Sequence, residues 1–172
     1  RLAVWLENQS FYHIKTLYAS ETTDAKEMLP YWAFKLKGWE EAKKEAEKKG
    51  VDLNETVDAV SGATENGSFD PADYIVPRET NSSMPYRVMI EINQPVDPTE
   101  KLEDQPSLIY QVEVDNYDPR TFQLLELVGF PVQEKNEEGD EEWAIYYVDE
   151  RFGSAMELID SALLSIERMI EK

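Results

Sequence analysis

The amino-acid sequence predicts a mostly β domain: a β-sandwich built of hairpins, with one inserted helix and a C-terminal helix. Several short segments rich in aromatic and β-branched residues alternate apolar and polar side chains, as half-buried strands do. Two other segments repeat apolar residues every three or four positions, which is the spacing of a helix that buries one face. At 172 residues the chain is long enough for one domain with a substantial core.

The first elements in chain order are a hairpin and a helix. Residues 2–7 and 11–18 are β-type runs, and the three polar residues from Asn8 to Ser10 have turn chemistry. From residue 29 to 49 the period changes, because Trp32 and Trp39 recur at helical spacing before a Lys- and Glu-rich end. We therefore expect a helix inserted near residues 29–49.

Regular strands return in the second half of the chain. Residues 86–93 and 108–115 alternate clearly, and residues 121–128 are expected to pair with residues 143–148 across the acidic loop 135–142. Carboxylates suit calcium, but this loop lacks the spacing of an EF-hand, so we favour a solvated hairpin tip. The residues expected to face one core are Val88, Ile90, Ile92, Tyr110, Val112 and Val114.

The end of the chain is predicted to be a second helix, over residues 154–172, docked on a sandwich formed by residues 1–153. Ser154 and Glu157 have capping-box spacing. Five exposed apolar residues would be costly, so we expect this face to pack on the sandwich or on the first helix rather than on a second molecule. The apolar residues on it are Met156, Ile159, Leu163, Ile166 and Ile170.

Charge and composition exclude several classes of function. With 36 acidic and 17 basic residues the net charge is −19, which repels nucleic acid, and no apolar run is long enough to span a membrane. The first residue is Arg1 rather than Met, which fits a removed export signal or a trimmed chain. The chain has no cysteine, and its one histidine, His13, lies mid-strand, where we expect a structural role.

These counts argue against an enzyme with a residue-based catalytic site. Nucleophilic triads and most zinc sites need an imidazole, and cysteine metal sites are ruled out by composition. Carboxylates are abundant, so composition alone does not exclude a glycosidase-like pair of acids. We rank this third among the functions considered.

One segment of the irregular connection between residues 51 and 85 has chemistry suited to a site. Asp58, Ser61, Gly62, Ala63 and Thr64 place two hydroxyls around a Gly-Ala pair that carries no bulky side chain. A large flat or charged group can therefore approach the backbone closely. The alternative is a tight turn in which Asp58 and Ser61 bond local amides, and from chemistry alone we favour the turn.

Three segments, "KTLY", "LPYW" and "VDAVSGAT", occur in that order and resemble the domain-of-unknown-function family 2271. The resemblance covers roughly residues 2–132. It implies an exported, periplasmic or cell-surface protein with a FlgD-like immunoglobulin-type sandwich, and no activity is established for the family. The sequence departs from the family in its long first helix, in the residues after Thr64, and in the C-terminal segment, which lies outside the resemblance.

The segment from Asp58 to Thr64 is also similar to the flavinylation motif of flavin-carrying subunits of sodium-translocating NADH:quinone reductases. In those proteins the last threonine of the motif carries FMN through a phosphoester, which here implies Thr64 as the attachment point. In those proteins the motif continues into a helix, whereas this chain continues into a loop and then the strand near residue 86.

Two functions therefore follow from the sequence. The first is a non-catalytic cell-envelope module, without a cofactor, that binds an envelope protein or small ligand through Trp32 and the connection carrying Asp58, Ser61 and Thr64. The second is a covalent-flavin electron carrier, with FMN on Thr64, Asp58 orienting the acceptor, and Gly62 and Ala63 giving clearance.

Overall fold

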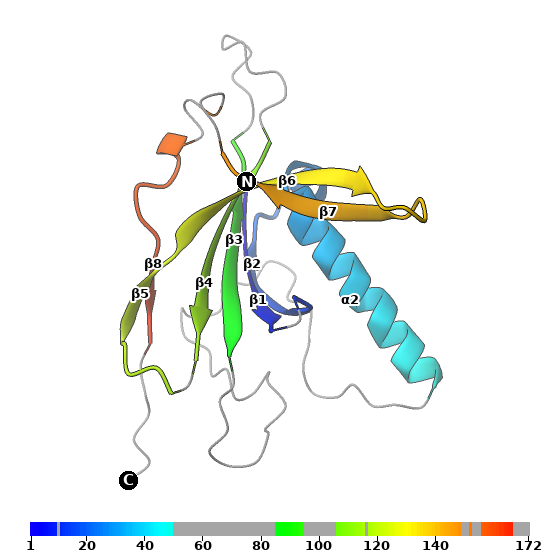
Figure 1. The fold of residues 1–172 in the computed structure, drawn as a ribbon, viewed down its shortest axis with the longest axis horizontal. Coiled ribbons are helices and arrows are strands. Elements are labelled where there is room, and N and C mark those ends of the chain that lie inside the picture. The colour runs from blue at the N-terminus through cyan, green and yellow to red at the C-terminus, as the bar shows by residue number, and fades with distance from the viewer. Residues whose placement is uncertain are drawn as a thin grey trace.

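The computed structural model describes residues 1–9, 11–49, 85–94, 106–115, 117–148, 152 and 156–166. This part of the chain forms an antiparallel six-stranded sheet in the order β2-β1-β3-β4-β6-β7 and a small sheet of β5 and β8 (Figure 1). The mostly β prediction is confirmed. The strands are β1 (Leu2–Asn8), β2 (His13–Ala19), β3 (Tyr86–Ile92), β4 (Leu108–Val114), β5 (Phe122–Leu124), β6 (Glu126–Lys135), β7 (Glu141–Tyr146) and β8 (Leu163–Ser165).

Two helices follow the opening hairpin: the short α1 (Ala25–Met28) and the long α2 (Pro30–Lys48). Both the β1–β2 hairpin and the first helix lie where the sequence predicts them. In Figure 1, α2 runs beside the sheet and slants away from it toward its C-terminal end. Within the described residues, neither helix is both long and apolar enough to cross a membrane.

One face of the six-stranded sheet carries the core that the alternation predicts. The register pairs Val88 with Val112 and Ile90 with Tyr110, which sets the six predicted residues on the same face. Leu164 and Ile166 pack against the part of this core that holds Val88. The small sheet therefore lies over the large one, as in a β-sandwich.

The opposite face of the sheet is covered by α2. Trp5, Met89 and Ile109 point to this side and are at most 2 % exposed. They pack against α2 and the residue before it through Leu29, Tyr31, Trp32 and Leu36. Both faces of the central strands are therefore buried, and the helix side also contains charged residues.

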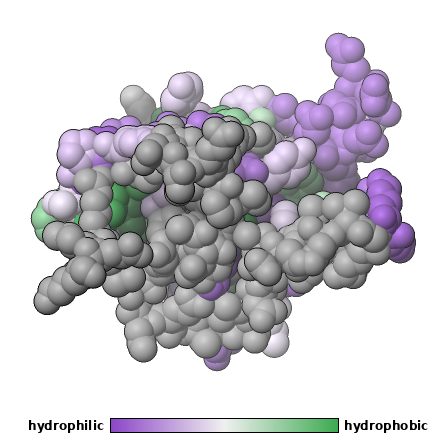
Figure 2. Space-filling view, turned by 90° about the horizontal axis from the view of Figure 1, so that it is seen from below, coloured by the Kyte–Doolittle hydropathy of each residue, from purple (hydrophilic) through white to green (hydrophobic). Residues whose placement is uncertain are grey.

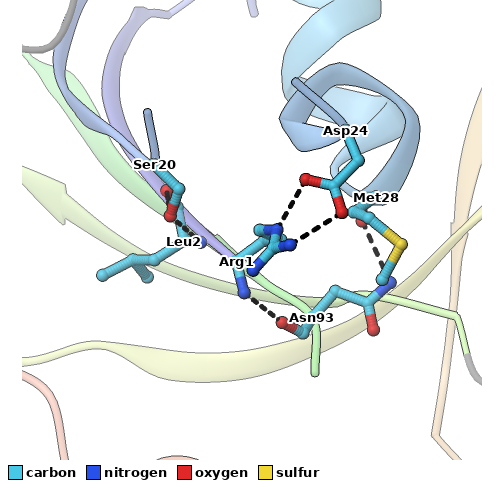
Figure 3. A network of polar contacts seen from close by, with 6 residues as sticks. All are labelled: Arg1, Leu2, Ser20, Asp24, Met28 and Asn93. Carbon is cyan, nitrogen blue, oxygen red and sulfur yellow. Dashed lines mark hydrogen bonds and ion pairs between the residues drawn. The ribbon is translucent and has the colours of Figure 1, made fainter. Parts of the chain in front are cut away.

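A polar network connects α1 to the start of β1 and the end of β3 (Figure 3). The guanidinium of Arg1 forms an ion pair with Asp24 at 2.7 Å, and the backbone N–H of Asn93 donates to the carbonyl of Arg1 at 2.9 Å. The side-chain amide of Asn93 donates to the carbonyl of Met28 at 3.0 Å. These bonds fix the segment that leads into α2.

The predicted C-terminal helix at 154–172 is wrong over the residues described there, 156–166. Leu163 to Ser165 form β8, which pairs with β5 in register Gln123 to Leu164. Leu163 is 60 % exposed, while Leu164 and Ile166 pack inward, so the alternation has a period of two. The strand edge of β5 supplies hydrogen bonds that local helical spacing does not reveal.

The predicted pairing of residues 121–128 with 143–148 is also wrong. Phe122 to Leu124 pair with β8, and β7 pairs instead with the outer half of β6, from Phe130 to Lys135. The strand pairing of β6 shifts register at Gly129, which has φ +147°. A Cβ there would lie 2.0 Å from the carbonyl oxygen of Tyr146, so only glycine fits this bulge.

Candidate functional site

Two carboxylates are fully buried between the sheet and α2. Glu7 on β1 and Glu91 on β3 are both 0 % exposed. Burying a carboxylate is costly unless it is paired or hydrogen-bonded. The partners of each therefore indicate what each one does.

Glu91 caps the N-terminus of α2. The residue before the helix is Leu29, which has no side-chain acceptor, so the first amides of the helix need a partner from elsewhere. Glu91 accepts the backbone N–H of Tyr31 at 3.2 Å and that of Trp32 at 2.7 Å. The hydroxyl of Ser107 donates to the same carboxylate at 2.5 Å.

These three donors favour the charged form of Glu91, but burial opposes it. Burial raises the pKa of Glu91 to about 7, against the lowering effect of its bonds to Ser107, Trp32 and Tyr31. The carboxylate has donors on both oxygens, and its role is structural.

Glu7 is less completely satisfied. The indole N–H of Trp5 donates to its Oε1 at 2.9 Å, and the ammonium of Lys35 lies 3.6 Å from the same oxygen. The other oxygen, Oε2, has no hydrogen-bond partner among the described residues. Burial raises the pKa of Glu7 and lowers that of Lys35, while each charge acts on the other in the opposite direction.

His13 is the cross-strand partner of Glu7 and is 1 % exposed. Its Nε2 lies 2.9 Å from the hydroxyl of Thr16, which also accepts the indole N–H of Trp32 at 3.0 Å. Burial, helped by the charge of Lys35, lowers the pKa of His13 to about 4, so the imidazole is neutral at pH 7. Within the described residues its Nδ1 has no hydrogen-bond partner, so the predicted structural histidine is only partly satisfied.

Next to Glu7 lies a group that we call the turn patch: Phe11, Tyr12, Lys35 and Arg87. The side chains of Lys35 and Arg87 are only 15 % and 14 % exposed. Phe11 and Tyr12 are 54 % and 63 % exposed. The guanidinium of Arg87 lies 4.1 Å from the centroid of the Phe11 ring, and the ammonium of Lys35 lies 5.9 Å from it. Two cations are thus gathered around an exposed aromatic ring in a chain of net charge −19.

The backbone of Phe11 is strained. Its φ is +62°, and among the described residues it is the one non-glycine residue with positive φ. Such a conformation costs about 1–3 kcal/mol for a bulky residue and persists only when its surroundings hold it. Lys35 donates to the carbonyl of Phe11 at 2.7 Å, which anchors the turn to α2.

The residues predicted as a site have different outcomes. Trp32 is 6 % exposed, with its backbone and indole N–H groups bonded to Glu91 and Thr16, so the structure places it in the core. The other predicted site residues lie outside the described residues: Asp58, Ser61, Gly62, Ala63 and Thr64.

Sequence reasoning missed the turn patch and the residues beneath it. One local signal was present, because Glu7 ends an apolar run on a strand and Arg87 interrupts another. No local signal marks Phe11, since positive φ is usually associated with Gly or Asn. Lys35 is indistinguishable in sequence from the other lysines of its helix.

Comparisons with known proteins add no assignment: no family model, no curated protein and no solved structure matches the chain. Among the described residues there is also no group of three or more acidic, histidine or cysteine side chains placed to hold a metal ion. The function is therefore inferred from the geometry of the turn patch and from the sequence.

Proposed function

We propose that the protein is a non-catalytic interaction module of the cell envelope that binds its ligand at the turn patch. The observation that supports this most directly is the strained backbone of Phe11, which holds an exposed phenyl ring close to Lys35 and Arg87. Strain of this kind is concentrated at binding sites, where it positions a side chain in advance. The ligand is an envelope protein or a small molecule with a planar or anionic group.

A binding role fits the described titratable groups better than a catalytic one. Three groups with shifted pKa values, Glu7, His13 and Glu91, are at most 1 % exposed. A general acid or base must come within hydrogen-bond distance of its substrate. Glu7 instead pairs with Lys35 of the turn patch, and Glu91 caps α2.

The envelope location is supported by the sequence. The resemblance of the "KTLY", "LPYW" and "VDAVSGAT" segments to family 2271 implies an exported protein. The immunoglobulin-type arrangement that the family implies is part of the same proposal.

Site-specific photo-crosslinking tests the turn patch as a binding surface. A benzophenone amino acid at Tyr12 should give an adduct of defined mass in envelope extract of the source cells, whereas the same group at Lys37 should not. Lys37 is a matched control because its side chain is 74 % exposed on the same helix as Lys35. Adding Phe11→Gly to the Tyr12 probe keeps the positive φ and removes the ring, so the adduct should disappear. Equal adducts at both positions would contradict the proposal.

The second candidate is a covalent-flavin electron carrier with FMN on Thr64. It is supported by the resemblance of residues 58–64 to the flavinylation motif. Co-expression with a flavin transferase should add the mass of one FMN phosphoester and flavin absorbance, and Thr64→Ala should abolish both. An unmodified chain after co-expression with an active transferase would exclude this candidate and leave the first one standing.

A further inference from the structure

The β6–β7 hairpin extends beyond the rest of the large sheet. Strand β4 pairs with β6 only as far as Gly129, and from Phe130 to Lys135 the described partner of β6 is β7 alone. β7 is the last strand in the sheet order of the described residues. In Figure 1 this hairpin crosses over α2 and ends in a projecting tip.

The register indicates which backbone groups lie along the outer edge of β7. The N–H of Asn136 donates to the carbonyl of Asp140 at 3.0 Å, which makes these two residues a hydrogen-bonded pair. Hydrogen-bonded and non-hydrogen-bonded residue pairs alternate along an antiparallel ladder. The backbone N–H and C=O groups of Glu141, Trp143 and Ile145 therefore point away from β6. The position of Pro131 agrees, because it lies opposite Ile145, where its missing N–H removes no bond to β7.

The inner face of the hairpin is held in place. Trp143 and Ile145 pack against the core cluster under α2, and the ring of Trp143 lies 6.4 Å from that of Phe34. The edge is therefore presented in a fixed orientation. Such pre-organisation lowers the entropy cost of adding a strand.

The exposed side chains of the hairpin carry mostly one sign of charge. Lys135 is the one basic residue between positions 134 and 142. The exposed acids of that segment are Glu134, Glu137, Glu138, Asp140, Glu141 and Glu142. In Figure 2 the right-hand end of the molecule, where the tip and the end of α2 lie in Figure 1, is strongly hydrophilic.

This charge has a cost within the hairpin itself. Glu134 and Glu142 are direct cross-strand partners, and like charges at that position are destabilising. Charged residues on an edge strand also prevent aggregation, but that role is commonly filled by lysine and does not require one sign. A positively charged partner accounts both for the negative sign of these side chains and for their position on the edge hairpin.

We propose that the outer edge of β7 binds an extended Lys- or Arg-rich segment of a partner protein as an added antiparallel or parallel strand. Backbone bonds to Glu141, Trp143 and Ile145 hold the segment, and the acidic side chains select its charge. A second copy of this chain is disfavoured because it carries the same net charge of −19. This surface is separate from the turn patch.

The probe is a synthetic peptide in which Lys alternates with Val over about nine residues, a typical strand length. Titration should protect the amides of Glu141, Trp143 and Ile145 from hydrogen exchange, and affinity should fall as salt rises. A peptide of equal charge with Pro at alternate positions cannot add as a strand and should bind about tenfold more weakly. Equal binding of the two peptides, without amide protection, would overturn the proposal in favour of simple charge attraction.

Matched variants locate the site. Glu141→Pro removes one outward N–H without removing a bond to β6, whereas Glu141→Gln removes only the charge. The Pro variant should lose about tenfold in affinity and the Gln variant about two- to threefold. Equal affinities of the Pro and Gln variants would refute strand addition. Phe11→Gly should leave this binding unchanged while abolishing the crosslink at Tyr12, which separates the two proposals.

Discussion

The two carboxylates buried between the sheet and α2, Glu7 and Glu91, differ in how many hydrogen bonds they accept. Glu91 accepts three hydrogen bonds, from two helix amides and Ser107. Glu7 is equally buried but accepts one, with the ammonium of Lys35 at 3.6 Å and one oxygen without a described partner. Glu91 therefore has a structural role, whereas Glu7, which lies next to Lys35 of the turn patch, keeps one oxygen without a hydrogen bond from the described part of the chain.

The largest expected effect on stability distinguishes these two carboxylates directly. Glu91→Ala leaves two helix amides and the hydroxyl of Ser107 without an acceptor, which should lower the free energy of unfolding by roughly 3–5 kcal/mol. Glu7→Ala removes the acceptor of one indole N–H and the partner of Lys35, and should cost about 1–2 kcal/mol. Urea denaturation of both variants gives the comparison. An equal or greater loss for Glu7→Ala would contradict the assignment of roles.

Stability should also depend on pH through Glu91. Its pKa in the folded protein is about 7, above the ordinary value of 4.5, so the protonated form is favoured in the folded state. The stability linked to this group is fully present below about pH 4.5 and is lost as pH rises through about 7, by roughly 3 kcal/mol at most. As pH rises across this range, the melting temperature of the wild type should therefore fall relative to that of Glu91→Gln. A constant difference would show that Glu91 does not titrate there.

Removing Lys35, the cation paired with Glu7, should have a smaller effect on stability. Lys35→Met leaves Glu7 without its charge partner and the carbonyl of Phe11 without its donor, and should cost about 1–2 kcal/mol. Lys37→Met is the matched control, since among the described residues Lys37 pairs with one exposed glutamate on the same helix. It should change stability by less than about 0.5 kcal/mol. Similar losses in the two variants would mean that the Glu7–Lys35 pair has no special role.

The smallest expected effect concerns the strain at Phe11. Phe11→Gly keeps the positive φ without its steric strain but loses the ring contacts with Arg87 and Lys35, so stability should change by less than about 1 kcal/mol in either direction. Thermal unfolding measures this. A loss of several kcal/mol would show that the ring is a structural part of the fold rather than a side chain held for binding.

The sequence predicted the elements whose signals are local. The β1–β2 hairpin, α2 and the shared face of Val88 and Val112 all follow from alternation or helical period. The C-terminal segment failed because its apolar residues satisfy helical spacing, while pairing with β5 decided the outcome. The cap of α2 was also beyond local reasoning, since Glu91 lies 60 residues after Tyr31.

That distant cap bears on the order in which the protein folds. Because Leu29 cannot cap the helix, α2 lacks a strong local start signal and gains its N-terminal acceptor only when β3 has paired with β1. Stable docking of the helix must therefore wait until the chain beyond Glu91 is available. The helix and the sheet should consequently appear together, as one cooperative unit, rather than the helix forming first as a scaffold for the strands.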